Sequence, residues 1–209
     1  MRAPRSYSVT ALVLAAVGTV ACSSGTPRPQ ESSPQVRQPY TQADVHFMSA
    51  MIAHHAQAID ISRWAPTHEA SPSLQILAER VINAQQDEIS LMQQWLRDRQ
   101  LPVPEARATA MTTMGGVAHA HHMPGMLSED QLKQLDQSRG KEFDRLFLTF
   151  MIQHHRGAVT MVEELFRSQG AGLDDTVFKL AADISADQSS EIDRMQKMLF
   201  TLTTGIPTL

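Results

Sequence analysis

The spacing of apolar positions along the chain predicts four long helices and no sheet. In four segments apolar residues recur every three or four positions, which is the period of a helix with one buried face. Residues near the predicted ends agree with these limits: Ser71 can cap a helix that starts at Pro72, and Gly170 can end another. The predicted helices cover residues 42–64, 72–98, 140–169 and 174–203.

The two halves of this pattern repeat one another. Seven residues of the first helix recur 100 positions later, and a second block that starts at Gln85 recurs 103 positions later. The first set is Asp44, Phe47, Met51, Ile52, His54, His55 and Ala58, matched by Asp144, Phe147, Met151, Ile152, His154, His155 and Ala158. A duplicated two-helix unit normally buries its apolar face against the other copy.

We therefore predict an all-α fold, a four-helix bundle built from two duplicated antiparallel hairpins and covering residues 41–205. Connections of about 5 to 8 residues make the two helices of each hairpin antiparallel neighbours. The longer segment 99–139 joins the hairpins as a crossover. Ser128 and Gln131 within it have the spacing of a capping box, which predicts a short helix that ends before Gly140.

Ionisable side chains interrupt the apolar faces of these helices. At about 100° per residue, Asp44 and His55 project into the middle of the first face and His54 lies at its edge. Gln57 and Asp60 fall on the opposite side, where we expect solvent. Because a buried ionisable group without a partner costs several kcal/mol, the inward groups must be satisfied by one another, by water or by an ion.

Each half of the chain offers the same mixture of candidate metal ligands. They are Met51, His54, His55, Asp44 and Glu88 in the first half, and Met151, His154, His155, Asp144 and Glu191 in the second. Thioether, imidazole and carboxylate together suit copper better than zinc or iron. The alternative is a buried histidine–carboxylate hydrogen-bond network that fixes helix register, with the two methionines as ordinary core residues.

The crossover is also rich in soft ligands. His119, His121, His122, Met123 and Met126 crowd into it, with Met111 and Met114 shortly before. This composition indicates a second possible metal-contacting segment. Its alternative is a loop rich in Ala and Gly in which the histidines are incidental.

Composition narrows the function classes. The formal net charge of −4 gives no electrostatic footprint for nucleic acid. Cys22 is the only cysteine, so an internal disulfide and thiolate chemistry within the folded domain are excluded. The chain has no Gly-x-Ser-x-Gly, His-Glu-x-x-His or Glu-x-x-His motif, so we expect no enzyme.

The beginning of the chain predicts export and lipid attachment. Residues 1–21 carry two arginines and then an apolar stretch too short to span a bilayer, as in a signal peptide. The segment Thr19-Val20-Ala21-Cys22 resembles a lipoprotein processing site, which would lipidate Cys22, for example with palmitate. Residues 22–40 are rich in Pro and Ser and have no apolar periodicity, so we expect them to form a disordered tether. The domain would then be membrane-anchored at the cell envelope, outside the cytoplasm; ordinary signal-peptidase cleavage beside an incidental cysteine is the alternative.

Three strings together resemble a known family. They are Asp44-x-x-Phe47 followed by Met51-Ile52-Ala53-His54-His55, its copy from Asp144 to His155, and Met123-Pro124-Gly125-Met126 between them. They resemble the family called domain of unknown function 305, over about residues 41–203. The resemblance implies a ferritin-like four-helix bundle, often exported, with some members linked to copper binding and copper tolerance. A copper-binding protein for tolerance, storage or delivery is thus our first hypothesis; a metal-free helical scaffold for a protein partner and a ferritin-like di-iron oxidase are the others.

Overall fold

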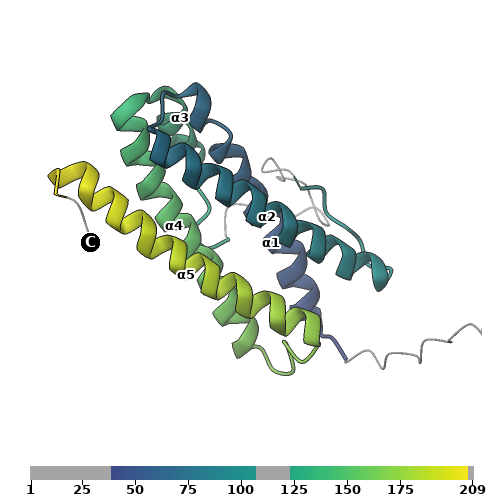
Figure 1. Cartoon of the computed structure of the whole chain (residues 1–209). Helices are drawn as coiled ribbons and strands as arrows, with labels where there is room; N and C mark the ends of the chain where they lie inside the picture. Colours follow the sequence, from purple (N-terminus) through teal and green to yellow (C-terminus); the bar gives the residue numbers. More distant parts are fainter. Residues whose placement is uncertain (1–38, 107–122, 207–209) are drawn as a thin grey trace, which may run out of the picture. The chain divides into compact units, whose positions relative to one another are not determined.

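The structure is a computed structural model that describes residues 39–106 and 123–206. Its helices are α1 (Gln42–Ser62), the short 3-10 helix η1 (Ala65–Thr67), α2 (Pro72–Asp98), α3 (Glu129–Gln137), α4 (Gly140–Arg167) and α5 (Asp175–Thr204). Within these two ranges there is no strand, and α1 with α2 and α4 with α5 form two hairpins (Figure 1). The predicted all-α fold is confirmed, and α1 and α4 each end two residues before the predicted limit.

The helices begin where local hydrogen bonding predicts. The Thr41 side chain accepts from the N–H of Asp44 while Asp44 accepts from the N–H of Thr41, so α1 opens with a capping box. Ser71 caps α2 ahead of Pro72, and Ser128 forms a second capping box at the start of α3. The short crossover helix and its cap are therefore confirmed.

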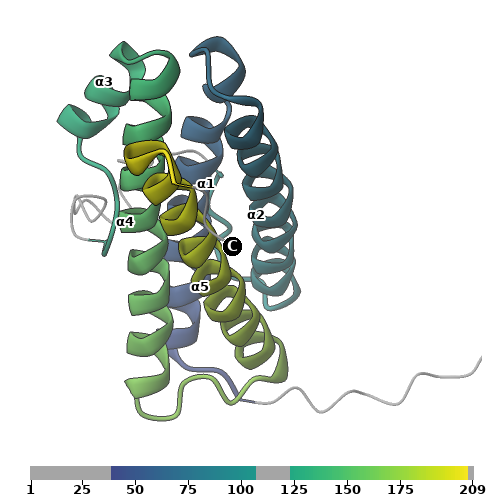
Figure 2. The ribbon, with the colours of Figure 1, turned by 60° about the vertical axis from the view of Figure 1, so that its left-hand side comes forward.

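The two hairpins meet through α1 and α4, which lie side by side in both views, whereas α2 and α5 make little direct contact (Figure 2). Fully buried side chains at this interface include Phe47, Met51, Phe147 and Met151, each with at most 3% exposure. Burying one such side chain stabilises the fold by about 1.5–3 kcal/mol.

None of the helices in the described part of the chain has the length and hydropathy of a membrane-spanning helix.

One aspartate in each hairpin binds the turn of the other hairpin. Oδ1 of Asp44 accepts a 2.7 Å hydrogen bond from the N–H of Gly172, which lies between α4 and α5. In the second copy, Asp144 accepts from the N–H of Ser71 at 3.1 Å, just before α2. These bonds place the start of α1 near the end of α4 and the start of α4 near the end of α1. The two helices therefore run antiparallel.

A buried ion pair joins the far ends of α2 and α5. Asp174 caps α5, accepts from Nε1 of Trp95 at 3.0 Å, and pairs with Arg99. The Arg99 guanidinium also lies 4.2 Å from the ring centroid of Trp95, and Tyr40 packs edge-on against the same ring. Because the side chains of Arg99 and Asp174 are only 9% and 4% exposed, the pair depends on both members being present.

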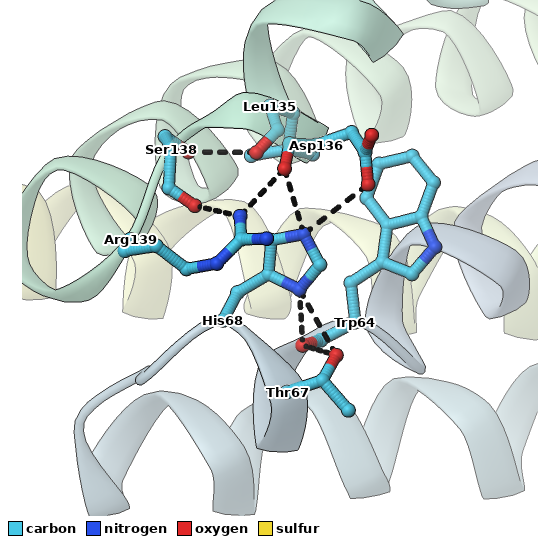
Figure 3. A network of polar contacts seen from close by, with 7 residues as sticks. All are labelled: Trp64, Thr67, His68, Leu135, Asp136, Ser138 and Arg139. Carbon is cyan, nitrogen blue, oxygen red and sulfur yellow. Dashed lines mark hydrogen bonds and ion pairs between the residues drawn. The ribbon is translucent and has the colours of Figure 1, made fainter.

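His68 anchors the short helix α3 at the other end of the molecule (Figure 3). Its Nε2 donates to the carbonyl oxygen of Asp136 at 3.0 Å, and its Nδ1 lies 3.0 Å from Oγ1 of Thr67. The ring stacks on Trp64 and also packs against Phe143. This buried imidazole has partners at both nitrogens, which is the ordinary state of a histidine in a protein core.

Candidate metal centre

Four fully buried histidines gather where the two hairpins meet. His54 and His55 come from α1, His154 and His155 from α4, and all four have 0% exposure. The rings of His54 and His154 lie against each other across the interface in a tilted arrangement, with centroids 3.9 Å apart and planes inclined at 41°. The antiparallel crossing of α1 and α4 thus brings together the two copies of the repeated motif.

Hydrogen bonds fix one nitrogen of three of these rings. Nε2 of His55 bonds to Oε2 of Glu88 at 2.6 Å, and Nε2 of His155 to Oε2 of Glu191 at 2.7 Å. Nε2 of His54 bonds to the carbonyl oxygen of Pro124 at 2.9 Å. A carboxylate or carbonyl oxygen only accepts, so in each ring Nε2 carries a proton, and Nδ1 is the lone-pair nitrogen of the neutral form of the ring.

The remaining ring nitrogens are buried and unpartnered. Nδ1 of His54, His55 and His155 has no hydrogen-bond partner among the described residues, and His154 lacks one at both of its nitrogens. Each buried, unsatisfied polar atom costs about 1–3 kcal/mol. Neutral imidazoles whose Nε2 is held by a carboxylate or carbonyl, with Nδ1 free, have the form that metal-ligating histidines take.

Burial also keeps two of the rings uncharged. Desolvation, reinforced by the nearby His55, lowers the pKa of His54 to about 3, although the hydrogen bond to Pro124 acts in the opposite direction. The pKa of His154 lies well below its ordinary value, first through burial and then through His54, His155 and His55. Both rings therefore keep a lone pair available at neutral and mildly acidic pH.

The Met123–Met126 segment of the crossover lies directly on this centre. Besides the Pro124 bond to His54, the carbonyl of Gly125 accepts from the side chain of Gln153 at 3.3 Å. Gly157 of α4 permits the approach, since a Cβ there would lie 2.0 Å from the Pro124 carbonyl oxygen and 2.6 Å from Cα of Gly125. The histidines of the crossover at 119, 121 and 122 lie outside the described residues.

Leu127, the residue after this segment, shows that the predicted exposure of Gln57 was wrong. Gln57 is 4% exposed, not solvent-facing, because its side chain donates to the Leu127 carbonyl at 3.2 Å and accepts from the Leu127 N–H at 2.8 Å. The helical period assigned the correct side of α1. The error arose because the crossover, and not water, covers that side.

The other predicted ligands divide into two groups. Met51 and Met151 are fully buried one helical turn before the histidine pairs, so they remain close to the centre. Asp44 and Asp144 do not reach it: they lie ten residues before His54 and His154, about 15 Å along the helix axis. Their carboxylates bind the backbone of the opposite hairpin's turn instead.

Beyond Glu88 and Glu191, the space between α2 and α5 forms a polar cavity of about 140 Å³. It is lined by Leu77, Arg80, Ala84, Gln85, Glu88, Asp187, Gln188, Ser190, Glu191 and Arg194. Desolvation raises the pKa of Asp187, and the neighbouring charges of Glu88, Glu191 and Asp183 raise it further. As folded, the described residues hold no preformed cluster of three or more His, Cys, Asp or Glu groups with metal-binding geometry.

The contact of Pro124 with His54, and the close approach that Gly157 permits, were not predicted from the sequence. A backbone carbonyl leaves no signature in the side-chain pattern, so the contact with Pro124 could not be read from it. Gly157 did give a signal, because a glycine inside a long helix costs about 1 kcal/mol relative to alanine and usually has a packing reason.

The fold and the site define a helical bundle of two duplicated hairpins with four histidines buried at their interface. The chain belongs to the family described as Domain of unknown function (DUF305), whose model matches residues 44–199. The resemblance seen in the sequence motifs is thereby confirmed.

Several solved structures are similar to this chain over most of its length. A DUF305 protein from Streptomyces coelicolor is 28% identical, with a TM-score of 0.64 over 77% of this chain and 94% of that one. A DUF305 fragment from Deinococcus radiodurans is also 28% identical, with a TM-score of 0.64 over 78% and 98%. CopM in its Cu(II)-bound form is 29% identical, with a TM-score of 0.59 over 76% and 96%.

A curated relative matches a shorter stretch. An uncharacterized protein from Acanthamoeba polyphaga mimivirus is 36% identical over 58 residues, which are 28% of this chain and 38% of that protein. The match therefore spans well under half of the relative's length, and it adds no functional argument.

Proposed function

We propose that this protein binds copper through the buried imidazoles of His54, His55, His154 and His155. The observation that carries the proposal is the unpartnered Nδ1 on all four buried rings, combined with an occupied Nε2 on three of them. Neutral imidazoles beside the thioethers of Met51 and Met151 are a donor set that suits copper. A bound ion would satisfy buried lone pairs that otherwise destabilise the fold.

Glu88 and Glu191 have a supporting role in this proposal. Each holds the Nε2 proton of its histidine, which fixes the tautomer, orients the ring and makes Nδ1 a better donor. Asp44 and Asp144 are left out of the ligand set because their oxygens already accept backbone hydrogen bonds. Met123 and Met126 remain candidate ligands, as do the crossover histidines at 119, 121 and 122.

The comparisons support copper as the ion. CopM, whose chain is 96% covered by the match, has been crystallised in Cu(II)-bound and Cu(I)-bound forms. It has also been crystallised with silver, which resembles Cu(I) in its preference for soft ligands. We propose that the role here is binding for tolerance, storage or delivery, and not catalysis.

We propose an extracytoplasmic, membrane-anchored location. The Streptomyces coelicolor neighbour carries a provisional description as a secreted protein, which supports export. Lipid attachment rests on Cys22 in the sequence, and residues 1–38 lie outside the described structure. Replacing Cys22 by Ala should abolish incorporation of a labelled acyl chain in the native host; continued incorporation would contradict the anchor.

A second candidate function is a metal-free scaffold, favoured by the two histidine–glutamate hydrogen bonds. In that case these bonds fix the register of the hairpins, and the outer helix faces bind a partner. Copper would then change little, while loss of the histidines would strongly destabilise the metal-free protein, because Glu88 and Glu191 would lose their partners.

The deciding experiment is a Cu(I) titration under a competing chelator, with melting curves recorded alongside. The variant with all four histidines replaced by Ala should lose most of the tightly bound copper. The matched control is His46→Ala, an exposed histidine of the same helix α1, which should bind copper as wild type does. Copper should raise the melting temperature of wild type by binding the folded state. Equal stoichiometry and affinity in wild type and the fourfold variant would refute the histidine site.

A further inference from the structure

The cavity between α2 and α5 contains a second group of metal-ligand side chains, which adjoins the histidine centre and shares Glu88 and Glu191 with it. Three carboxylates line it, those of Glu88, Asp187 and Glu191. Carboxylate oxygen is the ligand that Mn²⁺, Mg²⁺ and Ca²⁺ prefer. Burial raises the pKa of Asp187, and the charges of Glu88 and Glu191 raise it further, so both glutamates lie close enough to repel the Asp187 carboxylate.

Two glutamines add the observation that points to a ligand. Gln85 is 1% exposed and Gln188 is 2% exposed, and both side chains line the same cavity. Both amide atoms of Gln85 and the Oε1 of Gln188 lack a hydrogen-bond partner among the described residues. A buried amide without a partner costs about 1–3 kcal/mol. A ligand in the cavity would remove that cost, and amide carbonyl oxygens are ordinary ligands of hard cations.

The cavity has the size and setting for a partly hydrated ion. Its volume of about 140 Å³ is room for a few waters at about 30 Å³ each. Arg80 and Arg194 also line it, but both are exposed, and no ion pair joins either to the three carboxylates in the described part of the chain. Their long side chains can therefore turn outward when a cation arrives.

We propose that this cavity is an oxygen-ligand site for a divalent cation, formed by Glu88, Asp187, Glu191, Gln85 and Gln188. The five side chains come from facing turns of α2 and α5. Since the described residues hold no preformed cluster with metal-binding geometry, the proposal requires α2 and α5, which make little direct contact, to approach each other around the ion. The site uses oxygen ligands only, and it does not depend on copper binding by the imidazoles.

Mn(II) is a suitable probe, because the electron paramagnetic resonance signal of the free ion falls when it binds. The full wild-type chain, freed of other metals, should remove about one equivalent of Mn(II) from the signal. Asp187→Asn removes an exposed carboxylate that makes no hydrogen bond with the histidines, and it should weaken Mn(II) binding by about tenfold or more. The matched control is Asp183→Asn, one turn earlier on α5 and outside the cavity lining, which should change the affinity much less.

A second variant tests the amides. Gln85→Leu with Gln188→Leu should weaken Mn(II) binding about as much, while the metal-free fold becomes no less stable because two unsatisfied amides are gone. Cu(I) titration of the same variants keeps the two proposals separate: binding at the histidines should persist when the oxygen site is lost. An undiminished Mn(II) signal with wild type, or Mn(II) affinity equal to wild type in both variants, would overturn the oxygen-ligand site.

Discussion

The carboxylate of Asp44 accepts a hydrogen bond from the N–H of Gly172, a residue 128 positions further along the chain. The same carboxylate closes the capping box of α1 by accepting from Thr41. One side chain therefore starts a helix and holds the turn of the opposite hairpin. It is fully buried, so no water can replace either partner.

Replacing Asp44 by Ala should lower the free energy of unfolding of the metal-free protein by about 2–4 kcal/mol, since the cap and a buried N–H lose their acceptor together. Urea denaturation followed by circular dichroism measures this. Asp60→Ala on the exposed side of α1 is the control and should change stability by about 0.5 kcal/mol or less. Loss of copper binding at unchanged stability would instead make Asp44 a ligand.

Metal-free stability should fall as pH falls below about 6.5. Burial lowers the pKa of His54 to about 3, so between these pH values the unfolded chain binds a proton that the folded chain excludes. The contribution is fully present above pH 6.5 and decreases by up to about 1.4 kcal/mol per pH unit for this residue. His154 adds a change of the same sign.

Urea denaturation between pH 5 and 6.5 isolates this effect from the titration of ordinary carboxylates. His54→Gln should flatten the dependence of stability on pH, whereas His46→Gln, at an exposed position on the same helix, should leave it unchanged. The same slope in His54→Gln and wild type would show that His54 is not the group that titrates.

Gly157→Ala should destabilise the protein although alanine is the better helix former. The added Cβ would lie 2.0 Å from the Pro124 carbonyl oxygen, so the Met123–Met126 segment must move and the bond to His54 must break. We expect a loss of about 1–3 kcal/mol together with weaker Cu(I) binding. Gln153→Ala removes one hydrogen bond to the same segment without the clash, and its effect should be smaller. A gain in stability for Gly157→Ala would mean that the segment does not rest on α4.

Asp174→Ala should cost about 3–5 kcal/mol, because it leaves the Arg99 guanidinium buried without a counter-charge and removes the cap of α5. Adding Arg99→Met should restore part of that stability. Urea unfolding monitored by tryptophan fluorescence is informative here, since Trp95 contacts both residues. Equal stability of the single and double variants would show that the ion pair carries none of the loss.

The sequence predicted the helices well because the period, the caps and the repeat all indicate the same elements. Both ends of α2 were predicted correctly. At its start, the cap Ser71 and the following Pro72 leave the helix little freedom to begin elsewhere. The repeat also identified the four histidines. A polar residue on an apolar helix face is unusual, and here it occurs at equivalent positions in both copies.

The same repeat suggested a metal role for Asp44 and Asp144 that the structure does not support. Repetition shows that two residues occupy equivalent places, but it does not distinguish a ligand from a turn-holding side chain. What distinguishes them is which residue of the other hairpin each one meets. That depends on how α1 crosses α4, which no local pattern contains.

The Pro124 contact leaves the two halves of the repeat unequal. The carbonyl holds the ring of His54, whereas among the described residues no side chain or crossover carbonyl bonds to either nitrogen of its counterpart His154. Because no side chain or crossover carbonyl holds a nitrogen of His154, this ring can offer either one to an ion without giving up such a bond. If the imidazoles bind copper as proposed, the two copies of the motif meet the ion unequally: one ring is held in place, and the other has both nitrogens available.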